Sequence, residues 1–372
     1  LHSFIYGGAK CAGMGVLEKM HIIGLVELPR RIFLKSDADV RSNILFAECK
    51  KSDERSDYPI HAELVRKVGY KMGEGFTALP IRDEQTGLEL RNPDTNEMII
   101  DTDFNLVKDN FLALISMQKE NKTISWEGAH LSDITDHPQL DMKPRRLTRN
   151  ALVNLRTIIS KPCKRLYEIA DIVENVTVFS EEFESFDPLF LVEGQDIRAA
   201  EGSVVLKTSE KRWQAEVRKT SKGYHMHNKD IVVGLVRPER RNIGLYIGNK
   251  DNVFGCPDAV AIIRQKYEEY PVEWIFQVLR TEQVRIQLWT ESGGTSYDKL
   301  TLNQLKNILI PIPPENEIKA MVRKVRVWAD AQKQVQQSFD DIWEDEDRRV
   351  ILNSPNIGLE GRSILAGQET TL

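Results

Sequence analysis

The spacing of apolar and polar positions predicts two strands near the start of the chain. Ile22 to Leu28 is a continuous apolar run, the kind that forms a strand buried on both faces of a parallel sheet, and Arg41 to Glu48 predicts a second strand. Helices are expected over Ala62 to Gly69 and over Phe111 to Lys119. The polar stretch from Glu120 to Arg149 shows no clear period, which predicts a linker between two domains.

Short strands dominate the middle of the chain. Asn92-Pro93-Asp94 is a turn signal between two strand-like pieces. Further on, Pro271 to Trp289 predicts a single helix, because its large apolar residues share one broad face. The other predicted strands fall in the segments Lys164 to Thr177, which also holds a short helix, Phe190 to Gly202, Asn228 to Asn242, Gly244 to Gly248 and Asp258 to Ile263.

Two local signals follow one another closely after residue 300. Thr301 precedes Gln304 by the spacing of a capping box, so a short helix is expected to begin at Leu302. Ile308 to Ile310 is a brief apolar run that predicts a buried strand. Pro311 ends it, because proline cannot donate to a ladder of hydrogen bonds.

A long amphipathic helix is predicted after these prolines. Its apolar positions step by three and four residues, close to a heptad pattern, so the helix is expected to pack along another helix. The alternative is a helix that folds back on its own domain. The apolar positions are Ile318, Met321, Val325, Trp328, Val335, Phe339 and Ile342.

Composition places the chain among soluble globular proteins, and the succession of predicted strands and helices predicts an α/β (α+β) fold. With 372 residues, of which 41% are hydrophobic and 29% charged, it can form two domains. No apolar run is long enough for a transmembrane helix, and no secretion signal is visible. The four cysteines are scattered without a C-x-x-C pair, which disfavours a zinc site or a disulfide framework and predicts a reducing cytoplasm.

Charge is unevenly distributed, which changes what the net charge of −5 implies. A negative total argues against nucleic-acid binding. However, residues 205–250 hold eleven Lys or Arg against four acids, and residues 142–167 hold eight basic residues and no acid. Residues 340–347 carry six acids in eight positions. The basic stretches therefore remain candidates for binding the phosphate backbone of a nucleic acid.

Candidate DNA contacts lie in a loop over residues 207–229 and in a turn over residues 237–242. Lysine and arginine can neutralise phosphates, and arginine can also read guanine. Gly294, Thr295 and Ser296 could offer backbone N–H groups and hydroxyls to a phosphate. The alternatives are a solvated basic surface and a structural turn. The basic candidates are Lys211, Arg212, Arg218, Lys219, Lys222, Lys229, Arg237, Arg240 and Arg241.

No catalytic residue and no metal ligand is predicted. His225 and His227 would point to one face of a strand, but no third ligand is near in sequence. Gly13-x-Gly15 has no preceding strand, so a nucleotide-binding turn is not expected there. No nuclease motif with the spacing needed to hold magnesium is found.

The order of a glycine turn with hydroxyls, a capped short helix, an apolar strand, Pro-x-Pro-Pro and a long helix resembles the end of a target recognition domain in type I restriction-modification specificity subunits. The resemblance extends over about residues 160–330, where Phe190 to Gly202 and Asn228 to Asn242 look like successive strands of that domain. It implies a domain that reads DNA, followed by a spacer helix on which methyltransferase subunits dock.

The first hundred residues resemble the last segment of the catalytic domain of DNA adenine methyltransferases of the type I kind, where two strands finish a doubly wound sheet. The residues that carry the likeness are Met14 to Met20, Ile22 to Leu28, Leu28-Pro29, Ile32-Phe33 and Arg41 to Glu48. The alternative is a generic pair of strands. Asp187-Pro188-Leu189-Phe190 lacks the second proline of the family's adenine-binding loop, so the catalytic half is expected elsewhere.

These patterns and resemblances together predict a recognition module for double-stranded DNA that positions an adenine methyltransferase. No cofactor is expected in this chain; S-adenosylmethionine is expected in the missing catalytic part or partner. Alternatives are an assembly subunit that self-associates through residues 318–342, and a divergent intact methyltransferase. The expected organisation is a methyltransferase-like segment over 1–110, a linker over 111–159, a target recognition domain over 160–314, a spacer helix over 315–347 and a tail over 348–372.

Overall fold

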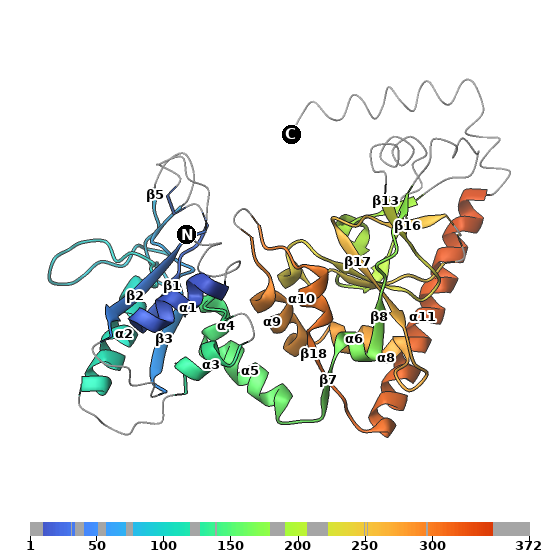
Figure 1. Ribbon diagram of the computed structural model, residues 1–372. Helices are drawn as coiled ribbons and strands as arrows, with labels where there is room; N and C mark the ends of the chain where they lie inside the picture. The colour runs from blue at the N-terminus through green and yellow to red at the C-terminus, as the bar shows by residue number, and fades with distance from the viewer. Residues whose placement is uncertain are drawn as a thin grey trace.

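The computed structural model has the mixed α/β fold that the sequence predicts, built as two units (Figure 1). We call residues 10–159 the N-terminal unit and residues 160–344 the C-terminal unit. The structure describes residues 10–30, 32–33, 41–50, 57–71, 77–119, 127–137, 140–178, 190–206, 222–248, 250, 252–294 and 297–344.

A four-stranded mixed sheet forms the centre of the N-terminal unit. Its order is β2-β1-β3-β6, in which β1 (Met20–Glu27) runs antiparallel to β2 (Asn43–Cys49) and parallel to β3 (Pro59–Leu64). β6 (Ala129–His130) pairs antiparallel with β3. Both predicted strands are therefore confirmed.

The continuous apolar run of β1 pairs in parallel with β3, as expected of a strand buried in a parallel sheet, while β1 and β2 are antiparallel. One expectation about this sheet is wrong. The segment Ala62 to Gly69 is not helical. Its first half belongs to β3, where Ile60 and His61 are buried by neighbouring elements that the sequence pattern does not reveal.

Three short helices form within the segment predicted to be a linker, and the linker boundaries themselves stay a prediction. Met142, Leu147 and Leu152 are buried in the same core as Ile22 and Leu25 of β1. A helix of four or five residues is too short to show a period, so the sequence pattern did not reveal the two shortest of these helices. The helices of this unit are α1 (Lys10–Lys19), α2 (Phe104–Lys119), α3 (Leu131–Thr135), α4 (Pro144–Leu147) and α5 (Arg149–Ile159).

Two sheets form the C-terminal unit around the fully buried strand β14 (Ile231–Gly234). The first sheet has the order β11-β12-β15-β14-β17-β8 and the second β10-β16-β13-β9. The remaining strands of these sheets are β8 (Ala170–Ile172), β9 (Thr177–Val178), β10 (Phe190–Val192), β11 (Ile197–Arg198), β12 (Ser203–Val204), β13 (Lys222–His225), β15 (Ile243–Leu245), β16 (Val253–Gly255) and β17 (Val260–Gln265), with a 3-10 turn η3 (Gly194–Asp196) between β10 and β11.

The single helix expected over Pro271 to Trp289 is two helices, α8 (Val272–Leu279) and α9 (Glu282–Glu291). Thr281 caps the second one, since its Oγ1 accepts a hydrogen bond from Val284 N at 3.4 Å. A continuous apolar face does not reveal this break, because both helices bury residues in one core.

The capping box at Thr301 is confirmed, and it starts α10 (Leu302–Lys306) at the predicted residue. Thr301 Oγ1 accepts from Gln304 N at 3.2 Å, while Gln304 Oε1 accepts from Thr301 N at 2.9 Å. The strand predicted next is β18 (Leu309–Pro311), which pairs with β7 (Cys163–Arg165) just before α6 (Leu166–Ile169).

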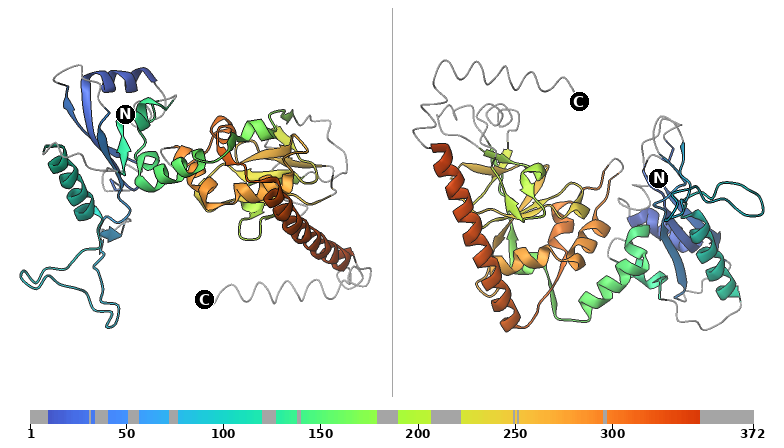
Figure 2. Two further views of the ribbon diagram at one scale, coloured as in Figure 1. Left: turned by 90° about the horizontal axis from the view of Figure 1, so that it is seen from below. Right: turned by 180° about the vertical axis from the view of Figure 1, so that it is seen from behind.

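The long helix α11 (Glu315–Glu344) lies along the C-terminal unit in its first half (Figure 2). Ile318, Val322 and Val325 are buried against α8, and the rings of Trp328 and Phe276 stack with centroids 5.5 Å apart. This part of the helix folds back on its own unit, as the alternative interpretation had it. The side chains of Phe339 and Ile342, and residues 345–372, lie outside the described residues.

In the part of the chain that the structure describes, no helix is long and apolar enough to cross a membrane.

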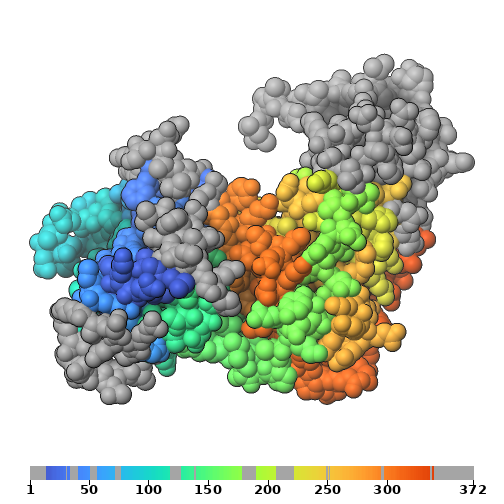
Figure 3. Space-filling view, in the orientation of Figure 1, coloured from blue at the N-terminus to red at the C-terminus, as the bar shows by residue number. Residues whose placement is uncertain are grey.

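A buried network of four charges joins the two units, which touch directly (Figure 3). Arg145 of α4 donates to Glu27 at the end of β1, at 2.5 Å and 3.1 Å, and to Asp298 of the C-terminal unit at 2.7 Å. Arg41 donates to both carboxylate oxygens of Asp298, at 2.5 Å and 3.0 Å, and its Nε lies 3.3 Å from Glu27. None of the four side chains is more than 16% exposed.

Removing one member of this network should strongly destabilise the protein, because a buried charge would lose its partner. We expect Arg145→Ala to lower the free energy of unfolding by about 3–5 kcal/mol. Arg82→Ala is the matched control, since it breaks the exposed pair with Glu89 and should cost about 1 kcal/mol or less. Urea unfolding of both variants measures the difference. Equal losses of unfolding free energy would contradict the role assigned to the buried network.

The same network predicts a loss of stability in acid. Burial alone would raise the pKa of Asp298, but hydrogen bonds from Arg41 and the charges of both arginines outweigh burial, so its pKa lies below the ordinary value. A carboxyl with a depressed pKa stabilises the fold above its unfolded pKa of about 3.9 and loses that contribution as the pH falls through the lower folded value. The unfolding free energy of the wild type should therefore fall toward that of Asp298→Asn below about pH 4. A gap between the two proteins that stays constant down to the folded pKa would contradict this assignment.

Candidate nucleic-acid interface

The turn that follows β14 exposes three arginines on a fixed backbone. It consists of Arg237, the 3-10 turn η4 (Pro238–Arg240) and Arg241. Arg237, Arg240 and Arg241 are exposed, while Pro238 is buried and anchors the turn. Arg237 N also donates to Asp298 O at 2.8 Å, which ties the turn to the residue at the centre of the charge network.

Two residues of this turn adopt a left-handed conformation that amino acids other than glycine rarely take. Arg237 has φ 52° and Arg241 has φ 56°. Each costs of order 1 kcal/mol or more, and such strain concentrates at functional sites. A strained turn with buried proline and exposed arginines is thus a strong candidate for a binding element.

The arginines of the turn differ in their partners. Arg241 pairs with Glu282, which also accepts from Arg285 Nε at 2.9 Å. Among the described residues, Arg237 and Arg240 have no acidic partner within ion-pair distance. These two guanidinium groups are therefore available to an external anion.

A second loop lies beside the turn and is closed by glycine. Gly293 and Lys299 exchange two backbone hydrogen bonds, at 3.0 Å and 2.8 Å, and Lys299 forms a bridge with Val236 just before the turn. Gly294 has φ 141°, and a Cβ built there would lie 2.1 Å from the carbonyl oxygen of Tyr297. Only glycine fits this position, so the loop is a structural turn whatever else it does.

The structure thus brings together some predicted site residues and separates others. Arg237, Arg240, Arg241 and Gly294 lie on two adjacent loops. Lys229 lies before the opposite end of β14, where its Nζ is 3.4 Å from Glu273 Oε1, and that carboxylate also binds Arg326. Lys222 is exposed on β13. Lys211, Arg212, Arg218, Lys219, Thr295 and Ser296 lie outside the described residues.

The two histidines of the predicted strand lie next to one another. His227 Nε2 is 3.3 Å from His225 Nδ1, and the ring of His225 also packs on Phe254. His227 N donates to Asp230 Oδ2 at 2.7 Å, and neither histidine belongs to a cluster of His, Cys, Asp and Glu ligands among the described residues.

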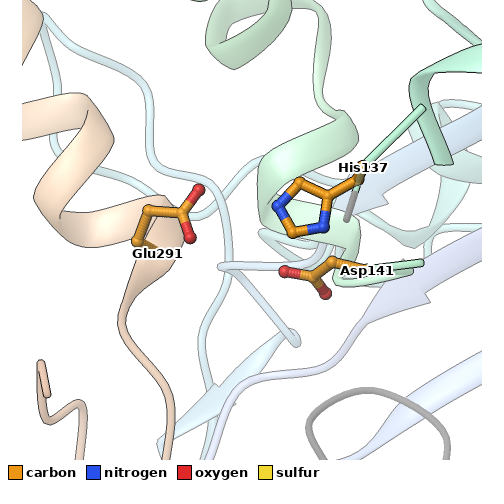
Figure 4. Close-up of side chains that lie close together, drawn as sticks. All are labelled: His137, Asp141 and Glu291. Atoms are coloured by element: carbon orange, nitrogen blue, oxygen red, sulfur yellow. The ribbon is translucent and has the colours of Figure 1, made fainter. Parts of the chain in front are cut away.

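A different cluster of potential ligands, His137, Asp141 and Glu291, was not predicted from the sequence. Their ligand atoms lie within 4.8 Å of one another at the contact between the units (Figure 4). Burial, then the charge of Arg146, lowers the pKa of His137 to about 4, and burial raises the pKa of Glu291. The separation of 150 residues between Asp141 and Glu291 leaves no sequence signal for this grouping.

Two nearby cations pair with Asp141 of this cluster. Lys143 Nζ lies 3.3 Å from Asp141 Oδ2 and donates to the backbone carbonyl oxygen of Glu291 at 3.1 Å. Arg146 Nε lies 3.8 Å from the Asp141 carboxylate. A divalent ion could use an imidazole and two carboxylates, and it would compete with these cations for Asp141. The geometry makes the cluster part of the contact between the units.

Comparisons with known proteins give structural neighbours only. No family model and no curated protein matches the chain. The HsdS subunit from Thermoanaerobacter tengcongensis is similar at 21% identity over 51% of this chain and 47% of that one, with a TM-score of 0.37. The type I restriction-modification S subunit from M. genitalium shares 13% identity over 53% of this chain and 47% of that one, with a TM-score of 0.34.

A larger share of the chain is covered by a third structure. The type IIG restriction endonuclease BpuSI shares 10% identity over 87% of this chain and 41% of that one, with a TM-score of 0.32. The chain therefore spans about half the length, or less, of the solved structures that it matches.

Proposed function

We propose that this chain is the DNA recognition module of a restriction-modification system. The observation that carries the proposal is the strained turn over residues 237–241, which exposes Arg237 and Arg240 without acidic partners among the described residues. Energy stored in two left-handed residues is hard to explain for a plain connection between strands. Arginine on a fixed backbone suits both jobs that DNA recognition requires, which are phosphate binding and bidentate contact with guanine.

The buried charge network gives this turn a fixed position relative to the N-terminal unit. Asp298 accepts from Arg41 and Arg145, and its backbone carbonyl accepts from Arg237 N. Three successive contacts thus link the recognition turn to the sheet of the N-terminal unit: Arg237 with Asp298, Asp298 with Arg145, and Arg145 with Glu27 of β1. In the proposed function, this coupling sets the distance between the base that is read and the methyltransferase that the N-terminal unit resembles.

Chemistry on the base would belong to a catalytic part outside the described residues. S-adenosylmethionine bound in that part would supply the methyl group, and the target adenine would have to leave the helix to reach it. The residues described above bind and orient the DNA and carry out no covalent step. Isothermal titration of this chain with S-adenosylmethionine tests this separation of DNA binding from catalysis, because one-to-one binding would favour a divergent intact methyltransferase instead.

A second candidate function is assembly through the far half of α11. Val335 is 51% exposed there, and Val327, near the middle of the helix, is 71% exposed, which leaves apolar surface for a partner helix. If assembly is the whole function, neutralising Arg237, Arg240 and Arg241 together leaves the activity of the complex intact.

The DNA-binding proposal predicts a defined response to loss of Arg240. We expect Arg240→Ala to weaken binding to the preferred duplex by about 1–3 kcal/mol if Arg240 reads a base. If it contacts a phosphate, the variant should instead weaken binding to all sequences and reduce the slope of log affinity against log salt by about 0.9. Binding to a randomised duplex library, followed by titration at several salt concentrations, measures both.

Arg323→Ala is the matched control, because Arg323 is an exposed arginine on α11, which packs on α8, whereas the turn packs on α9. It should leave both affinity and salt slope unchanged. No enriched sequence and no salt dependence with the wild type, tested with and without a methyltransferase subunit, would contradict the proposal.

A further inference from the structure

An arm made of residues 79–101 projects from the N-terminal unit, away from the C-terminal unit (Figures 1 and 2). Just before it, β4 (Tyr70–Lys71) pairs with β5 (Thr77–Ala78). The arm contains two tandem copies of one motif. Residues 81–90 read IRDEQTGLEL and residues 90–99 read LRNPDTNEMI, so each position corresponds to the one nine residues later.

The two copies share the same turn and several equivalent hydrogen bonds. Asp83 Oδ1 accepts from the backbone N–H groups of the second and third residues after it, and Asn92 Oδ1 does the same in the second copy. Arg82 Nη1 donates to Gly87 O at 3.1 Å, and Arg91 Nη1 donates to Asn96 O at 3.0 Å. The acceptors Gly87 and Asn96 share a left-handed conformation, at φ 70° and 57°.

The base of the arm, around Leu79 and Asp101, is called the stem here. A ring of three backbone hydrogen bonds holds the junction between the stem and the two hairpins. Ile81 N donates to Ile99 O at 2.8 Å, Leu90 N to Ile81 O at 2.9 Å, and Ile99 N to Leu90 O at 3.0 Å. The stem itself is held by Leu79 N to Gly69 O and Asp101 N to Leu79 O, each at 2.8 Å. Three residues spaced by nine thus occupy equivalent corners of one junction.

These corners carry aliphatic side chains that remain in solvent. Ile81, Leu90 and Ile99 are 38%, 38% and 37% exposed, and Leu79 and Leu88 beside them are 45% and 69% exposed. The nearly equal exposure of the three corner side chains fits their equivalent places in the ring. Five exposed aliphatic residues on a single short arm exceed the scattered apolar residues of an ordinary surface.

The charge on the arm decides what kind of partner fits it. Residues 82–101 hold six Asp or Glu and only Arg82 and Arg91 as basic residues. Arg82 is already paired with Glu89, and Arg91 is bonded within its own hairpin. An acidic arm repels a phosphate backbone and another copy of itself, and it attracts a surface rich in lysine and arginine.

We propose that the arm is a docking platform for a protein partner that presents apolar side chains flanked by lysine and arginine. The aliphatic junction supplies the central contact, and the acidic hairpins supply a complementary rim. Because the ring and the side-chain bonds already hold the arm, binding loses little conformational entropy. This surface is separate from the recognition turn, so the inference stands independently of the proposed function.

The test uses the full chain and a random peptide library displayed on phage. Peptides selected by the wild type should combine Lys or Arg with Leu, Ile or an aromatic residue. The best synthetic peptide should bind Leu90→Asp about tenfold or more weakly. Adding salt should weaken binding to the wild type, since the rim is electrostatic.

Leu106→Asp is the matched control, because Leu106 is 61% exposed on α2 and introduces the same charge change outside the arm. It should bind the peptide as the wild type does, and circular dichroism should show both variants folded. The proposal is overturned if no basic apolar peptide is enriched over Leu90→Asp. It is also overturned if Leu90→Asp instead weakens binding to duplex DNA, or converts a dimer of this chain to a monomer.

Discussion

The contact between the two units depends on a single carboxylate. Asp298 is the member of the network that belongs to the C-terminal unit, and both Arg41 and Arg145 bind it. Since a buried charge without enough partners is strongly unfavourable, loss of Asp298 would leave Glu27 alone to balance the two arginines. The same residue supports Arg237 through its carbonyl. Docking of the units and the shape of the recognition turn therefore depend on the same residue, Asp298.

Local signals predicted local structure well. The capping box at Thr301, the strand before Pro311 and the long helix after it depend on neighbours in sequence, and all three are confirmed. The errors share a different cause. The strand β3, the short helices around Leu147 and the break before Thr281 are decided by packing against distant residues, which leaves no trace in the period of one segment. The domain boundaries stay predictions.

In the candidate site, too, the sequence predicted the local features and missed those that depend on distant residues. The turn at Arg237 was visible as a cluster of arginines around a proline, and the structure adds the strain and the neighbouring loop of Gly294. The sequence did not distinguish Arg240, which has no acidic partner among the described residues, from Lys229, which is paired with Glu273 on another helix. The pairing of Lys229 depends on a residue 44 positions away in the sequence. A count of basic residues therefore overstates the number of cationic side chains that are free to bind DNA.

The tandem hairpins of the arm also constrain how this chain can change in length. A ring of three backbone hydrogen bonds joins Ile81, Leu90 and Ile99, and each hairpin between two corners is complete in itself. Adding or removing one residue would shift an arginine, its acceptor and the left-handed position out of register together. Adding or removing nine would keep every hairpin intact and change only the number of corners. Among relatives of this protein, the length of the arm should therefore vary in steps of nine residues, which is one whole hairpin.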